Sequence, residues 1–181
     1  MGHETPSNNL TEKSLAWENI RTEVDAMTDA LGKPVDSQIK EAVIAIMAHE
    51  FPTIGSCEGH IDEGAERPLY PYVMVSSPEY DGWKESEIVT NIMIAENLGY
   101  QKNMIVLLNE FYETHNSPFD SHLSFEGFGP TWGFKLRSVG ADVMKILTSD
   151  EKERKLALYR QEMDDFAKFL KNKFFAEVIP H

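Results

Sequence analysis

The sequence predicts one α+β domain spanning residues 1–181, in which a mostly antiparallel sheet of about four strands, arranged as two ββ units, packs against amphipathic helices. Three observations lead to this class. Apolar residues recur at helical spacing in several segments, short β-branched or aromatic segments occur in pairs, and no linker-like composition divides the chain. A chain of 181 residues, 41% of them hydrophobic, has the size and composition of a single core.

The N-terminal part of the chain predicts two helices. In the first, apolar residues follow one another at intervals of three or four positions: Trp17, Ile20, Val24, Met27 and Leu31. This is the spacing of one helical face, and Gly32 and Pro34 are expected to end the helix. Asp36 is expected to cap a second helix, which stops at Phe51-Pro52.

Two pairs of strands are predicted. The first pair comprises residues 53–56 and 70–77, which are rich in β-branched and aromatic residues. The second is a hairpin with its turn at Gly129-Pro130, and its apolar positions alternate with polar ones: Leu123, Phe125, Trp132, Phe134 and Leu136. One apolar face of this hairpin must therefore be covered by another element.

Two longer helices are predicted around the hairpin. The first lies between Lys84 and His115, and Gly99 is a candidate point of division. The second runs over residues 149–176, begins with a capping box formed by Thr148 and Glu151, and carries an apolar stripe: Leu156, Tyr159, Met163, Phe166, Leu170 and Phe174. We expect this stripe to dock on the core, where it covers the hairpin.

Charge and composition exclude several functional classes. A net charge of −13 repels phosphate backbones, so nucleic acid is not an expected partner. No apolar segment has the length of a membrane helix, and the N-terminus lacks the apolar core of a signal peptide. The single cysteine, Cys57, fits a reducing compartment. We therefore expect a cytoplasmic protein that meets a small molecule or another protein, not a membrane.

The candidate site is the segment Ser56-Cys57-Glu58-Gly59-His60, which follows the first predicted strand directly. A thiol, a carboxylate and an imidazole here occupy four consecutive positions. An imidazole can activate a thiol as a nucleophile, which makes Cys57, His60 and Glu58 candidate catalytic residues. The competing interpretation is structural, with Cys57 as a small buried apolar residue and His60 hydrogen-bonded to a carbonyl.

The same segment is a candidate metal site. Cys57 and His60 supply the thiolate and imidazole ligands that zinc prefers, but this pair lacks a second pair in sequence. Additional ligands would have to come from a distant histidine or a nearby acid: His49, His115, His122, Asp62 or Glu63. The sequence indicates no particular organic cofactor.

Further ligand-binding positions are predicted at Ser56, Gly59, Tyr72 and Trp132. Because the loop after the first strand and the hairpin both combine glycine with aromatic residues, we expect Cys57 and His60 at the mouth of a concavity between the first strand and residues 127–133.

The segment from Phe51 to His60, together with Tyr70-Pro71-Tyr72-Val73, resembles uncharacterised bacterial proteins that carry a helix, a Ser-Cys-Glu-Gly-His loop and an aromatic-proline strand. That resemblance brings no known activity. The loop alone is also similar to the tRNA wybutosine-synthesis methyltransferases, where Ser56, Cys57 and Gly59 match a Ser-Cys-x-Gly-Arg loop and His60 replaces arginine. With a charge of −13, this similarity implies a shared loop geometry and not methyltransferase activity on tRNA.

The leading functional hypothesis is an α+β protein that binds a small ligand or metal through the loop 56–60, with catalysis by Cys57 and His60 as an extension of it. The alternative is a noncatalytic interaction protein. In one form of that alternative, the first and last helices form a homodimer, because both carry apolar residues at seven-residue spacing.

Overall fold

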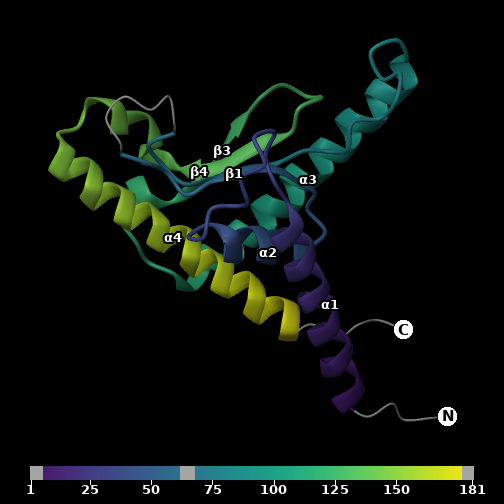
Figure 1. Ribbon diagram of the computed structural model, residues 1–181, viewed down its shortest axis with the longest axis horizontal. Helices are drawn as coiled ribbons and strands as arrows, with labels where there is room; N and C mark the ends of the chain where they lie inside the picture. The colour runs from purple at the N-terminus through teal and green to yellow at the C-terminus, as the bar shows by residue number, and fades with distance from the viewer. Residues whose placement is uncertain (1–5, 62–67, 177–181) are drawn as a thin grey trace.

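The computed structural model describes residues 6–61 and 68–176, which form the elements labelled in Figure 1. The helices are α1 (Pro6–Ala26), α2 (Lys40–Ala48), α3 (Glu87–Thr114) and α4 (Ser149–Ala176). Two short 3-10 segments, η1 (Phe119–Ser121) and η2 (Val139–Ile146), precede β3 and follow β4. The strands are β1 (Thr53–Cys57), β2 (Tyr72–Val75), β3 (Leu123–Gly127) and β4 (Phe134–Ser138).

The strands form one antiparallel sheet in the order β1-β2-β4-β3. Both predicted ββ pairs are therefore confirmed, and β2 joins them by pairing with β4. Side chains alternate across the sheet: Val73 and Leu136 are buried on its inner face, whereas Tyr72 and Arg137 are paired on its outer face. This is the α+β class that the sequence predicts.

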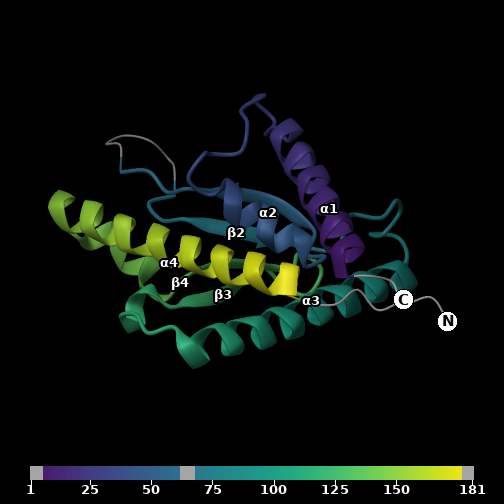
Figure 2. The same cartoon turned by 90° about the horizontal axis from the view of Figure 1, so that it is seen from below.

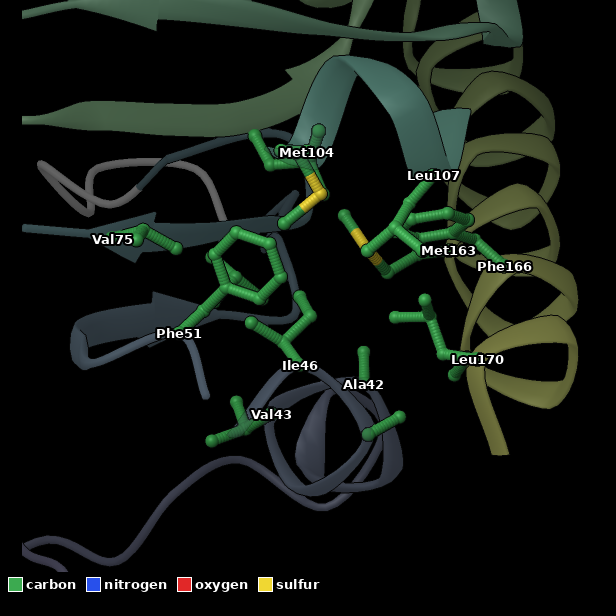
Figure 3. Packing of buried hydrophobic residues seen from close by; sticks show 14 of the residues in the cluster. Ala42, Val43, Ile46, Phe51, Val75, Met104, Leu107, Met163, Phe166 and Leu170 are labelled. Atoms are coloured by element: carbon green, nitrogen blue, oxygen red, sulfur yellow. The ribbon is translucent and has the colours of Figure 1, made fainter. Parts of the chain in front are cut away.

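Helices cover the inner face of the sheet. α4 packs along α2 and passes beside α3, as Figure 2 shows. In the core, Ile46 of α2 and Met104 of α3 approach Met163 and Phe166 of α4, as Figure 3 shows. These side chains are buried together with Val75 of the sheet. The apolar stripe of the last helix therefore docks on the core, as its spacing predicts.

The first two helices differ from their predicted bounds. α1 ends at Ala26, and residues 27–34 form a small hairpin closed by a bridge between Thr28 and Pro34. Asp29 Oδ1 accepts the backbone N–H groups of Leu31 and Lys33, both at 2.8 Å, and this local turn replaces the last helical turn. The cap assigned to Asp36 is also wrong, since the N-cap of α2 is Ile39.

Two further predictions, for the long helix and for the hairpin, differ from the structure. Gly99 does not divide α3, which is continuous from Glu87 to Thr114. Its N-cap is Ser86, whose hydroxyl accepts the Val89 N–H. Trp132 lies outside β4 in the connecting turn and is 49% exposed, so the apolar alternation of the hairpin starts at Phe134.

A buried carboxylate joins the end of α3 to α4. Glu162 is buried, and its oxygens accept hydrogen bonds from the Tyr112 phenol at 2.8 Å and the Ser117 hydroxyl at 2.9 Å. His115 Nε2 lies 3.1 Å from the same carboxylate. Burial raises the pKa of Tyr112 far above its ordinary value, so the phenol remains a donor. The burial cost of this carboxylate is thus offset by surrounding donors.

We predict that Phe166→Ala destabilises the protein by about 3–5 kcal/mol, because it empties a fully buried aromatic position. Lys168→Ala on the same helix is the control, since its side chain is largely exposed and pairs only with Asp165, a contact worth about 0–1 kcal/mol. Urea unfolding gives both free energies. Equal and small effects of the two substitutions would mean that α4 is not part of the core.

Candidate metal-binding site

A cavity of about 630 Å³ lies between the edge strand β1 and residues 27–36. Its lining includes Gly55 and Cys57 from β1, Tyr72 from β2, and Val35 and Asp36 from the opposite wall. Its volume is in the range of small-molecule sites. The predicted concavity therefore exists beside β1, but the expected wall was wrong: it is the hairpin 27–34 and its continuation, not residues 127–133.

The loop after β1 depends on one glycine. Gly59 has φ +81°, and a Cβ atom there would lie 2.7 Å from Leu156 Cδ1 and 2.8 Å from the backbone of Tyr70. A side chain at this position would be strained both by its backbone conformation and by contact. The loop therefore takes a shape that only glycine fits, and it lies directly against α4.

Polar contacts fix the same loop from both sides. Arg160 of α4 donates to the carbonyl of Glu58 at 2.8 Å and to that of Gly59 at 2.7 Å. The Glu58 carboxylate accepts the backbone N–H of Gln38 at 3.0 Å, which joins the loop to the start of α2. The positions of Cys57 and His60 are thus set by the core helices.

Three potential metal ligands converge at the mouth of this loop. One ligand atom from each of Asp36, Cys57 and His60 lies within 4.8 Å of the other two. His60 Nε2 is 3.5 Å from Asp36 Oδ2, and two ligands bound tetrahedrally to zinc at their usual bond lengths are about 3.3 Å apart. Only small side-chain adjustments would bring the donor atoms to a common ion.

Backbone N–H groups support two of these ligands. Glu58 N–H donates to Asp36 Oδ2 at 3.2 Å, and Gly59 N–H donates to Cys57 Sγ at 3.4 Å. Hydrogen bonds of this kind orient ligands in metal sites and partly compensate the charge of a thiolate and a carboxylate. Cys57 is buried, whereas Asp36 and His60 are half-buried at the cavity.

The distant histidines considered as additional ligands lie elsewhere. His49 Nε2 is 2.9 Å from the carbonyl of Leu170, His115 contacts Glu162, and His122 Nε2 is 3.1 Å from the carbonyl of Ser117. Asp62 and Glu63 lie outside the described residues. The third potential ligand is instead Asp36, which the sequence predicted as the cap of the second helix.

The remaining predicted site residues fall into two groups. Ser56 and Tyr72 line the cavity, and Tyr72 is paired with Cys57 across the β1-β2 ladder, which places both on the same face. Burial raises the pKa of Tyr72, so its phenol stays a hydrogen-bond donor.

The other group lies away from the cavity. Glu58 and Gly59 hold the loop but are not among the described lining residues. Trp132 is also not among them: it packs edge-on against Trp83, with 5.8 Å between the ring centroids.

Asp36 was missed because it precedes the loop by more than 20 residues and no spacing links the two. No signal in the sequence could have found Asp36, because an acid shortly before a helix is normally explained as its N-cap. Only the folded chain shows that the N-cap of α2 is Ile39 and that the Asp36 carboxylate is not needed there.

Comparison with protein-family models, curated proteins and solved structures found no match for this chain. The resemblance of residues 56–60 to other Ser-Cys-x-Gly loops stays a prediction. None of the helices in the described part of the chain is long and apolar enough to cross a membrane.

We predict that Gly59→Ala destabilises the protein by more than the about 1–2 kcal/mol expected for its left-handed backbone alone, because the new Cβ also meets Leu156 and Tyr70. The control is Gly99→Ala in the interior of α3, where a Cβ would meet nothing within 4 Å. That change should stabilise the helix by about 0.5–1 kcal/mol. Thermal unfolding of both variants measures the two effects. Similar changes in the unfolding temperature would contradict the packing described for the loop.

Proposed function

We propose that this protein binds one divalent metal of the zinc class through Asp36, Cys57 and His60, and that the metal takes a small ligand from the cavity beside β1. The observation that carries this proposal is the convergence of three different donor atoms within 4.8 Å at the wall of that cavity. A sulfur, a nitrogen and an oxygen donor together favour zinc over the oxygen-preferring magnesium and calcium.

The arrangement favours a metal over a nucleophilic thiol. In a nucleophile-base-acid triad the carboxylate and the nucleophile bind opposite nitrogens of the imidazole, so the two stay on opposite sides of the ring. Here the donor atoms of Asp36 and Cys57 lie within 4.8 Å of each other as well as of His60. This mutual closeness of all three donor atoms supports coordination of one ion over the extended arrangement of a triad.

The coordination number indicates what the site would do. Structural zinc sites use four protein ligands, whereas catalytic sites use three and leave a position for water or substrate. Three ligands are brought together within the described residues, and the cavity adjoins them. A metal held here would polarise a bound water or carbonyl, and the phenol of Tyr72, opposite Cys57, would donate to an oxygen in that position.

The proposed ligand is a small molecule and the proposed compartment is the cytoplasm. A thiolate ligand fits a reducing environment, and Cys57 is the single cysteine of the sequence. The net charge of −13 argues against nucleic acid as the partner.

Purified protein should bind one zinc ion per chain, measured by metal analysis after dialysis and by competition with a chelating dye. Cys57→Ser, His60→Gln and Asp36→Asn should each lower affinity by more than the roughly 10–100-fold lost when only an outer hydrogen-bond partner of a ligand is removed. Binding should release protons and weaken as the pH falls, because the ligands must be deprotonated.

Asp81→Asn is the matched control, since Asp81 is an exposed acid outside the ligand group. Cobalt substitution adds a ligand-specific readout: the sulfur-to-metal charge-transfer absorption should disappear in Cys57→Ser and persist in Asp36→Asn. A native chain that takes up no zinc or cobalt would overturn the proposal, as would unchanged affinity in all three variants.

A second candidate function is interaction with another copy of the chain. The surface that favours it is on α3, not on the first and last helices that the sequence indicated. The apolar faces of α1 and α4 are used inside the chain, where Trp17 stacks near Phe174 and Phe175 at 5.7 and 5.6 Å. An exposed row on α3 is instead available: Ile88, Ile92, Ala95 and Gly99. The small side chains of Ala95 and Gly99 leave room for a second helix to pack against this row.

If this row mediates a homodimer, Ile92→Glu should convert a dimer to a monomer in sedimentation velocity, because it places a charge among apolar side chains. Asn19→Glu adds the same charge on the exposed side of α1 and should leave the assembly unchanged. A native chain that sediments as a monomer at tens of micromolar would exclude this second function.

A further inference from the structure

The cavity contains a second charged point besides the proposed metal ligands. Lys33, from the hairpin 27–34, is the only lysine or arginine among the described lining residues. It is exposed and makes no ion pair with another side chain in the described ranges 6–61 and 68–176. A lysine on a cavity wall without a counter-charge is a candidate for recognising an anionic ligand.

The acids near Lys33 have other contacts, so its ammonium group can pair with an anionic ligand. Of the two acids that line the cavity near Lys33, Asp36 is a proposed metal ligand, and Asp29 accepts the N–H groups of Leu31 and Lys33 within its own turn. A thiolate from Cys57 and a carboxylate from Asp36 would balance the two positive charges of a zinc ion. The ammonium of Lys33 would then be balanced by the ligand.

The chain limits how far the two charged points can be separated. Lys33 and Asp36 are three peptide steps apart, so their Cα atoms are at most about 11 Å from each other. Because the Lys33 side chain can also fold along this wall toward the ligand group, a molecule whose metal-binding group and anionic group are separated by a few bonds is long enough to reach both.

The wall between these points is apolar. Leu31 and Ile54, which are 79% and 53% exposed, both line the cavity, and Pro34 and Val35 lie between the two charged positions. Exposed apolar side chains on a concave wall are the surfaces that a ligand covers. The lining thus matches a molecule with polar groups at its ends and a hydrocarbon segment between them.

We propose that the ligand of this site is a short organic anion, whose coordinating group binds the metal and whose distal anionic group pairs with Lys33. This inference rests on the proposed metal site and adds the chemical class that the site selects. Lys33 is then a specificity-determining residue. Its position depends on the hairpin 27–34, because the Asx turn at Asp29 directs the chain back toward β1.

The experiment compares two probes on the zinc-loaded full chain by isothermal titration calorimetry. Succinic acid monohydroxamate and butyrohydroxamate share the zinc-binding hydroxamate and the same chain length, but only the first carries a distal carboxylate. The native protein should bind the succinate probe about tenfold more tightly than the neutral one, the gain expected for one charge-assisted contact at a partly exposed site.

Lys33→Met retains the aliphatic side chain and removes the charge, so it should reduce this preference to less than about twofold while leaving the affinity for butyrohydroxamate unchanged. Lys102→Met is the matched control, since Lys102 is exposed on α3 and outside the cavity lining, and it should retain the full preference. Zinc content of every variant is measured in parallel.

The outcomes separate the two proposals. Equal binding of both probes by the native zinc-loaded protein, or an unchanged preference in Lys33→Met, would overturn the role of Lys33 while leaving the metal site intact. A chain that holds no zinc and binds neither probe would overturn the metal site, and this inference with it. Loss of the preference in Lys102→Met as well would also contradict the assignment, because the effect would then reflect overall charge.

Discussion

Arg160 connects the core of this protein to its candidate site. Its guanidinium donates two hydrogen bonds, one to the carbonyl of Glu58 and one to that of Gly59. Arg160 belongs to α4, whose neighbouring residues Tyr159 and Met163 are buried. The packing that fixes α4 therefore also fixes the loop after β1. Because a guanidinium presents its donors in a rigid plane, it sets the direction of both carbonyls at once. The backbone N–H groups of the loop are left to point toward Asp36 and Cys57.

The same helix organises the opposite end of the sheet. Two residues after Arg160, the buried carboxylate of Glu162 accepts hydrogen bonds from Tyr112 and Ser117 at the end of α3. Tyr112 also accepts the backbone N–H of Leu123, so the start of β3 is tied to this network. A buried charge with several donors tolerates little displacement, since any lost partner leaves it uncompensated. α4 thus acts as a rigid element to which both halves of the sheet are attached.

The candidate site lies at the sheet edge, where β1 pairs with β2 and, among the residues that the structure describes, with no second strand. The segment 27–36 lies beside that edge without adding a regular strand to it, and the space between them is the cavity. This arrangement brings an acid from before α2 to a thiol and an imidazole from after β1. Edge strands are exposed to pairing with other chains, and here a loop wall and a half-buried polar cluster occupy part of that edge.

The sequence by itself determined the elements whose signal is local. The apolar stripe of α4, the Thr148–Glu151 cap and the β3-β4 hairpin all follow from the period of side chains or from a turn, and all are present. It also paired Cys57 and His60 as candidate site residues, because they lie only three positions apart in the chain. The end of α1 was wrong because one carboxylate, Asp29, satisfied backbone donors that a further helical turn would have used.

Only the tertiary structure decided which residues meet at the candidate site. Asp36 meets Cys57 and His60 because α2 packs on α4 and the hairpin 27–34 turns back toward β1, and no sequence period encodes a contact across that distance. Trp132 was separated from the site for the same reason, since the twist and order of the strands place the β3-β4 turn away from the edge formed by β1. Local spacing specifies helices and strands, whereas convergence of side chains depends on how the core packs.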